Sequence, residues 1–260
     1  MKELLSDIIC PGSGGVVSLI GAGGKTSLMF RLARELRSAG RTVLTTTTTR
    51  IFLPADDETD ALIMTSDPED LLRQVRCGRG DRSHITAGVA ITGSGKLTGF
   101  PPEAIGMFAA SGLFDWIVVE ADGSARRPLK APADHEPVIP SASTAVVAVV
   151  GLDAVGKPFS DEVVFRAETA SAAMGLRPGE KISEEAVARL IAHPSGGFKG
   201  ATPDARRIVF LNKADDPERE ASGARITGLL QEHSSVVADT VVVGALGAGR
   251  ITAVFRLEGK

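Results

Sequence analysis

A glycine-rich stretch near the N-terminus carries residue types that bind phosphate. The mostly apolar residues 16–20 lead into Gly21-Ala22-Gly23-Gly24-Lys25-Thr26-Ser27, and apolar residues at helical spacing follow. In such a strand–loop–helix unit, the loop N–H groups and the helix N-terminus bind an anion, lysine reaches the terminal phosphates, and a threonine hydroxyl holds magnesium. We therefore predict a nucleoside triphosphate site with Lys25 catalytic and Thr26 a Mg²⁺ ligand. The predicted binding residues are Gly21, Ala22, Gly23, Gly24, Lys25, Thr26 and Ser27.

This glycine-rich loop departs from the usual phosphate-binding pattern at one position. That pattern has a glycine five residues before Gly24, where this chain has Leu19. We expect Gly21 to make the turn instead, because glycine adopts positive φ without steric cost. The other interpretation is a glycine-rich turn between a strand and a helix that binds nothing.

A second candidate group follows an apolar run. Residues 116–119 are apolar, as in a parallel strand buried on both faces, and Glu120-Ala121-Asp122-Gly123 comes next. In P-loop proteins an acid at this point holds magnesium through water, and a following glycine N–H senses the terminal phosphate. We predict that Glu120 is a metal-binding and catalytic acid, that Asp122 orients the attacking water, and that Gly123 contacts the nucleotide. A carboxylate here can also be an ordinary turn residue.

A third group predicts which base is bound. Residues 207–211 read as a strand that delivers Asn212-Lys213-Ala214-Asp215, and Asn-Lys-x-Asp at a strand end is the guanine-reading motif of P-loop GTPases. Asp215 is suited to accept from the ring N–H and the exocyclic amine of guanine. Such charge-assisted bonds contribute about 1.5–3 kcal/mol each, enough for about ten- to hundredfold discrimination against adenine. Asn212 would brace the glycine-rich loop, and the Lys213 stem would lie along the base. The predicted ligand is GTP, with ATP possible.

The loop at residues 124–140, called the basic loop below, comes shortly after the predicted magnesium acid. It combines basic residues with prolines, which stiffen a loop. Its basic residues either neutralise phosphate or bind an anionic substrate or partner, or they form a solvated loop, and both interpretations remain open. A metal site needs three or four ligands, which His135 and Glu136 alone do not supply. The predicted substrate or partner residues are Arg126, Arg127, Lys130, His135 and Glu136.

Five consecutive threonines at residues 45–49 precede Arg50. Threonine suits strands, so β propensity alone explains the run. In an open parallel sheet, however, ligands bind beyond the carboxyl ends of the strands, which would direct the last threonines and Arg50 at the phosphates. Both interpretations remain open.

The order of apolar segments predicts the elements that position these groups. Strand, helix and strand in succession imply a parallel crossover. The predicted fold is α/β, a doubly wound, mostly parallel sheet of P-loop NTPase type in three α/β/α layers, forming one domain over residues 1–260. A β-hairpin is expected at the sheet edge from residue 85 to residue 98. Helices are expected at about 27–39, 68–75, 101–112, 161–174, 183–193 and 218–233, and later strands at 144–150, 207–211, 236–243 and, as strand or helix, 251–257.

The composition excludes several classes of protein. Of 260 residues, 43% are hydrophobic and 23% are charged, and the formal net charge is -3. Mild acidity without a basic stripe argues against a nucleic-acid partner. The distant Cys10 and Cys77 indicate a reducing compartment. The first seven residues carry acids and no apolar core, and no apolar run spans a membrane, so we expect a cytoplasmic protein without membrane contact.

The three groups together resemble the YqeC family, and the likeness extends over nearly the whole chain. Membership would imply an accessory role in maturing a selenium-dependent molybdenum hydroxylase, with that enzyme or its maturation factors as partner. More distantly, the combination is similar to GTPases that insert nickel or cobalamin into metalloenzymes. The stretches that carry the resemblance are Gly21-Ala22-Gly23-Gly24-Lys25-Thr26, Glu120-Ala121-Asp122-Gly123 with Arg126-Arg127-Pro128-Leu129-Lys130-Ala131-Pro132, His135-Glu136-Pro137-Val138-Ile139-Pro140, Gly151-Leu152-Asp153-Ala154 and Leu211-Asn212-Lys213-Ala214-Asp215.

Two classes of function follow. The first is a GTPase accessory protein whose slow, magnesium-dependent hydrolysis drives delivery or modification of a metal cofactor. The second is a small-molecule kinase or ligase that phosphorylates a metabolite in the same site, with Asp122 as base and the basic loop holding the acceptor. A kinase releases nucleoside diphosphate only when an acceptor is present, whereas a GTPase responds to a protein partner.

Overall fold

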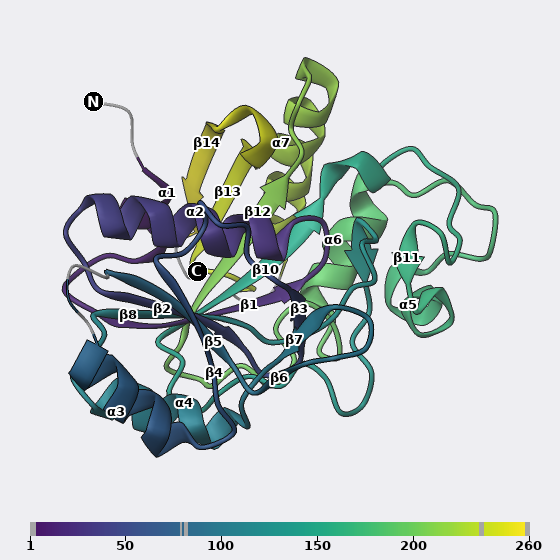
Figure 1. The fold of residues 1–260 in the computed structure, drawn as a ribbon. Coiled ribbons are helices and arrows are strands. Elements are labelled where there is room, and N and C mark those ends of the chain that lie inside the picture. The colour runs from purple at the N-terminus through teal and green to yellow at the C-terminus, as the bar shows by residue number, and fades with distance from the viewer. Residues whose placement is uncertain (1–3, 79, 81–82, 234–236, 258–260) are drawn as a thin grey trace. The chain divides into compact units, whose positions relative to one another are not determined.

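The computed structural model describes residues 4–78, 80, 83–233 and 237–257 (Figure 1). The chain divides into two compact units. The first comprises Met1–Leu19, Thr26–Gly123 and Val138–Ala145, and the second comprises Ile20–Lys25, Ser124–Pro137 and Val146–Lys260. The single domain expected over residues 1–260 stays a prediction. The start of the N-terminal segment, residues 1–3, and the first residue of the strand expected at 236–243 lie outside the described residues.

Five strands of the first unit form a parallel sheet in the order β1-β8-β2-β5-β4. Each neighbouring pair in this order is parallel. β2 and β8 are buried along their whole length, which explains their continuous runs of β-branched and apolar residues. The last two residues of β1 belong to the second unit. The strands are β1 (Gly15–Gly21), β2 (Val43–Thr47), β4 (Ala61–Met64), β5 (His84–Gly88) and β8 (Trp116–Glu120).

Helices cover both faces of these strands, with α2 on one side and α3 and α4 on the other (Figure 1). α2 (Lys25–Ser38) buries Leu28, Leu32 and Leu36, the apolar stripe that predicted it. α3 (Pro68–Gly78) and α4 (Pro102–Ala110) share one apolar cluster with the strands. The short α1 (Leu5–Ile9) was not predicted, and the buried Glu35 carboxylate accepts its Ser6 N–H at 2.8 Å.

The expected hairpin is present, but its first part belongs elsewhere. β6 (Ala90–Ile91) and β7 (Lys96–Thr98) pair antiparallel, and β7 also pairs with β3 (Arg50–Phe52) in a separate three-stranded sheet. The preceding residues form β5, a parallel strand between β2 and β4, instead of the first hairpin strand. Alternating residues identify a strand but not its partner, so the sequence pattern did not separate β5 from the hairpin.

Four strands of the second unit lie in the order β14-β13-β12-β10. β12 and β13 are parallel, and β14 is antiparallel to β13. Two short strands, β9 and β11, form a separate parallel pair. The strands are β9 (Leu129–Lys130), β10 (Ala145–Gly151), β11 (Val164–Phe165), β12 (Arg206–Asn212), β13 (Thr240–Ala245) and β14 (Arg250–Arg256), and the 3₁₀ turns are η1 (Leu152–Ala154) and η2 (Leu246–Ala248).

The helices α5 (Ala167–Met174), α6 (Glu184–Ala192) and α7 (Pro217–Glu232) share one apolar cluster with β10, β12 and β13. Ser183 caps α6 by accepting Ala186 N–H, and Asp216 caps α7 by accepting Arg219 N–H. α5 is shorter than the predicted 161–174. Arg166 adopts a left-handed conformation and β11 precedes it, so the helix begins at residue 167.

These elements give a mixed α/β fold with a large, mostly parallel sheet flanked by helices, consistent with a P-loop NTPase-like, three-layer α/β/α protein. The predicted fold class is therefore confirmed. Among the described residues, no helix is both long and apolar enough to cross a membrane.

Candidate functional site

The glycine-rich loop begins at the end of β1, where Gly21 turns the chain. Gly21 has a φ of 86°, and a Cβ there would collide with the Val149 carbonyl oxygen. Only glycine satisfies both constraints. This confirms the prediction that Gly21 makes the turn in a loop with Leu19 at the usual glycine position. Leu19 itself is fully buried in β1.

Backbone hydrogen bonds fix the loop within the second unit. Ala22 N–H donates to Val149 O at 2.8 Å, and Gly23 N–H donates to Arg127 O at 3.1 Å. A Cβ on Gly23 would collide with the backbone nitrogen of Gly151, so the close approach also requires glycine. The loop therefore lies against both the end of β10 and the basic loop.

The end of this loop carries positive charge from the Lys25 ammonium and from the N-terminus of α2, which begins at Lys25. The first N–H groups of a helix have no intrahelical acceptor and carry partial positive charge. The Lys25 side chain is buried, and its Nζ donates to Gly21 O at 2.6 Å, across the loop that it closes. Thr26 and Ser27 follow in the first turn. This arrangement has the chemistry of an anion site.

Asn212, at the end of β12, connects two loops of the second unit. Its Nδ2 donates to Gly23 O at 2.8 Å, and its Oδ1 accepts Leu246 N–H at 3.1 Å. Asn212 is buried, and its bond to Gly23 O is shielded from water. The predicted contact between Asn212 and the glycine-rich loop is thus present.

The next two charged residues of this motif each have an ion-pair partner that the sequence analysis missed. Lys213 Nζ lies 3.0 Å from Asp153 Oδ2, and Asp215 Oδ2 lies 3.2 Å from Arg219 Nη1. Arg219 lies in the first turn of α7, and Asp215 lies just before that helix. Asp153 follows the end of β10 in η1, a position where acids face ligands in open α/β sheets.

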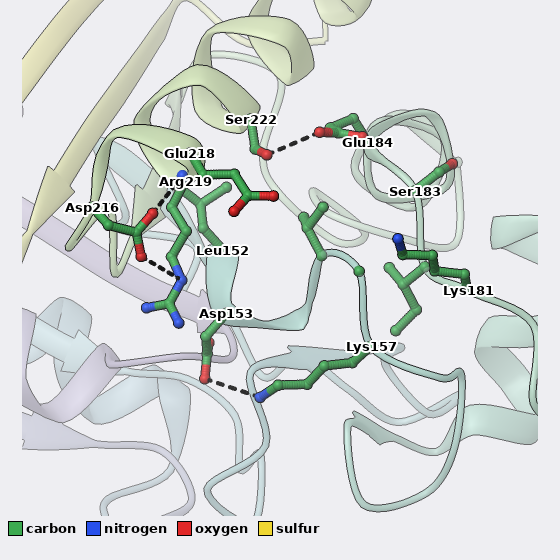
Figure 2. Close-up of a pocket in the computed structure, with 13 residues that line it drawn as sticks. Leu152, Asp153, Lys157, Lys181, Ser183, Glu184, Asp216, Glu218, Arg219 and Ser222 are labelled. Atoms are coloured by element: carbon green, nitrogen blue, oxygen red, sulfur yellow. Dashed lines mark hydrogen bonds and ion pairs between the residues drawn. The ribbon is translucent and has the colours of Figure 1, made fainter.

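A pocket of about 480 Å³ opens in the second unit among η1, α6 and α7 (Figure 2). Asp153 and Arg219, the partners of the motif, form part of its wall together with Lys157 and Asp216. Figure 2 shows the Glu218 carboxylate pointing into this space. Its size is that of a small-molecule site, and both signs of charge line it.

In the first unit, two predicted magnesium ligands meet. Thr26 Oγ1 donates to Glu120 Oε2 at 2.7 Å. The carboxylate therefore lies beside the hydroxyl, as a Mg²⁺ ion bound directly by Thr26 and through water by Glu120 requires. The described residues contain no group of three or more His, Cys, Asp or Glu placed to hold a metal. Mg²⁺ held mainly by phosphates and water needs no such group.

The threonine run holds Glu120 in place. Thr47 Oγ1 donates to Glu120 O at 2.6 Å, and Thr48 N–H donates to the same oxygen at 3.2 Å. The hydroxyls of Thr45 and Thr46 also bond within the first unit, to β5. These bonds hold the first threonines of the run in the sheet, and the expected ligand role of the last threonines and Arg50 stays a prediction. Asp122 and Gly123 follow Glu120, and the Asp122 side chain is buried.

The basic loop contains a buried ion cluster. Lys130 Nζ and Arg166 Nη1 each lie 2.5 Å from Glu136 Oε2, and the Lys130 side chain is only 1% exposed. Burial raises the pKa of Glu136, but hydrogen bonds from Arg166 and Lys130 outweigh it and lower the pKa to about 2. Lys130 and Glu136 therefore hold the loop together, whereas His135 is exposed.

Further contacts anchor the same loop within the second unit. β9 pairs with β11, and Lys199 Nζ donates to Ala133 O at 2.7 Å. Arg127 Nε donates to Asp161 O at 2.8 Å. Arg126 is exposed and has a φ of 62°, a left-handed conformation that non-glycine residues seldom adopt. The loop is therefore fixed at its base and presents Arg126 at its surface.

Comparison with known proteins identifies the chain. The family model described as "YqeC protein" matches residues 17–168. The "Uncharacterized protein YqeC" of Escherichia coli (strain K12) is 36% identical over 224 residues, which cover 84% of this chain and 83% of that protein. This chain belongs to the YqeC family.

The YqeC match covers only part of the candidate site. Residues 17–168 contain the glycine-rich loop, Glu120, Asp122 and the basic loop, but the motif at 212–215 lies beyond them. The contacts of Asn212 with Gly23 O and of Lys213 with Asp153 connect the motif to the matched region.

The ion cluster generates a stability prediction for this YqeC-family protein. Glu136→Gln should lower the free energy of unfolding at pH 7 by about 3 kcal/mol, because it leaves the Lys130 ammonium buried without its counter-charge. The Glu136 pKa lies below its ordinary value of 4.5, so its contribution is present above pH 4.5 and is lost as the pH falls toward 2. Urea unfolding at several pH values measures both effects.

A matched control is Glu180→Gln, which breaks the exposed pair with Arg177. It should change the unfolding free energy little. Adding Lys130→Met to Glu136→Gln should recover part of the loss. Equal effects of the Glu136 and Glu180 variants would show that the cluster does not stabilise the loop.

Proposed function

We propose that this YqeC-family protein binds Mg²⁺ and GTP at the glycine-rich loop and hydrolyses GTP slowly. The observation that carries the proposal is the 2.8 Å hydrogen bond from Asn212 Nδ2 to Gly23 O. It joins the segment that would read the base to the loop that would bind the phosphates. The φ of 86° at Gly21 and the Lys25 ammonium at the start of α2 further support an anion site.

Each predicted residue has a role in this proposal. The backbone N–H groups of residues 22–27 and Lys25 bind the phosphates, and Asp215 accepts from the base. Thr26 and Glu120 would hold Mg²⁺, which neutralises charge on the phosphate oxygens when bound. Asp122 would orient the attacking water. Gly123 would contact the terminal phosphate through its N–H.

We also propose that this cycle serves the maturation of a selenium-dependent molybdenum hydroxylase in the cytoplasm. This role rests on the YqeC family resemblance, and the Escherichia coli relative adds no activity because it is described as uncharacterized. The exposed Arg126 supports a contact surface on the basic loop. The buried Lys130 is part of the frame that supports this surface.

Asp215→Asn tests the base. The replacement turns an acceptor into a donor, so GTP affinity should fall about ten- to hundredfold, and xanthosine triphosphate, which has a carbonyl in place of the guanine amine, should bind better. Calorimetric titration with GTP, ATP and xanthosine triphosphate measures the preference. Asp216→Asn, at the neighbouring position, is the control. Asp216 caps α7, and asparagine can replace it as the cap. Equal wild-type affinities for ATP and GTP would exclude the guanine assignment.

Hydrolysis rates test the accessory role. The isolated protein should hydrolyse GTP slowly, and the hydroxylase or its maturation factors should raise the rate, by as much as about 10³–10⁵ where the partner supplies an arginine. Arg126→Ala should abolish this rise and preserve GTP affinity. Fast hydrolysis by the protein alone would contradict the accessory role. Phosphate transfer to a small metabolite would favour the kinase alternative.

A further inference from the structure

Lys213 is held at both ends of its side chain. At the backbone it has a φ of 66°, a left-handed conformation between buried Asn212 and buried Ala214. At the far end, its Nζ lies 3.0 Å from Asp153 Oδ2. Between these ends run four methylene groups, and the side chain is 35% exposed. The exposed part of Lys213 is thus free to contact a ligand while its two ends are fixed.

Asp153 is itself fixed and depends on Lys213 for its charge balance. It lies in η1, directly after β10, and its side chain is 19% exposed. Its second oxygen, Oδ1, is buried and has no hydrogen-bond partner within the described part of the chain. A second cation, Lys157, is 3.8 Å away on a side chain that is 49% exposed (Figure 2). Lys213 is therefore the close partner of this carboxylate.

We propose that Asp153 is a positioning residue that fixes the Lys213 stem as a flat apolar surface for the base. This inference rests on the proposed GTP site. A free lysine side chain loses much rotamer freedom when it packs against a ligand. The ion pair with Asp153 restricts that freedom before the ligand arrives, so base binding costs less entropy. The lysine methylenes then contribute apolar contact while the charge stays with the carboxylate.

The proposal separates the base from the phosphates. Lys25 and the loop N–H groups would bind the phosphates. Asp153 would not act on Lys25 or on these N–H groups. Removing the Asp153 carboxylate should therefore weaken binding only of ligands that carry a base. A purely structural role would instead weaken phosphate binding as well, because Gly151 lies between Asp153 and Gly23.

The test measures the affinities of GTP and inorganic tripolyphosphate for wild type, Asp153→Asn and Asp153→Ala. Asp153→Ala should weaken GTP binding about three- to tenfold, Asp153→Asn should weaken it less, and tripolyphosphate affinity should not change. In a double-mutant cycle, Asp153→Ala should cause no further loss once Lys213→Met is present. Arg177→Met, which breaks an exposed ion pair with Glu180, is the matched control and should leave both affinities unchanged.

The outcomes distinguish this inference from the proposed function. If wild type binds tripolyphosphate but not GTP, or binds neither, the proposed function fails first. The inference alone is wrong if wild type binds GTP and Asp153→Ala does not change the GTP affinity. It is also wrong if the loss of GTP affinity in Asp153→Ala adds fully to the loss in Lys213→Met. Weaker tripolyphosphate binding by both Asp153 variants would likewise overturn it in favour of a structural role.

Discussion

The candidate site of the second unit depends on two hydrogen bonds made by the backbone of Gly23. Its N–H donates to Arg127 O, and its carbonyl accepts Asn212 Nδ2. One residue thus joins the glycine-rich loop, the basic loop and the segment after β12. Because a Cβ would collide with Gly151, no other residue type permits this approach. The same two hydrogen bonds therefore fix the glycine-rich loop and the segment after β12 relative to each other.

Paired charges make the surroundings of this contact rigid. Lys130 and Arg166 share the Glu136 carboxylate, and Lys213 pairs with Asp153. Buried ions are costly to desolvate, so such pairs fix geometry more than they add stability, and breaking one leaves an uncompensated charge. A site whose side chains are already ordered loses less entropy when a ligand binds. Under the proposed function, the pairs would order the loops before GTP binds.

The sequence predicted those features that depend on short patterns. The turn at Gly21 follows from glycine conformation, and the Asn212 contact follows from the rule that ligand-binding loops gather beyond the carboxyl ends of parallel strands. The burial of Lys130 was not predictable in this way. It depends on the pairing of β9 with β11 and on Arg166, which lies far from Lys130 in the sequence. The short α5 and the parallel β5 were mispredicted for the same reason, since periodicity does not reveal the partner of a strand.

The central claim is that the glycine-rich loop binds the phosphates of Mg²⁺·GTP. Titration calorimetry of wild type and Lys25→Ala with GTP in the presence of magnesium tests it most directly. Lys25 Nζ donates to Gly21 O, a carbonyl of the loop itself, at 2.6 Å. Circular dichroism should confirm that the variant stays folded. The account predicts saturable binding by wild type that is lost in Lys25→Ala. Absence of binding by wild type, or equal affinity in the folded variant, would contradict it.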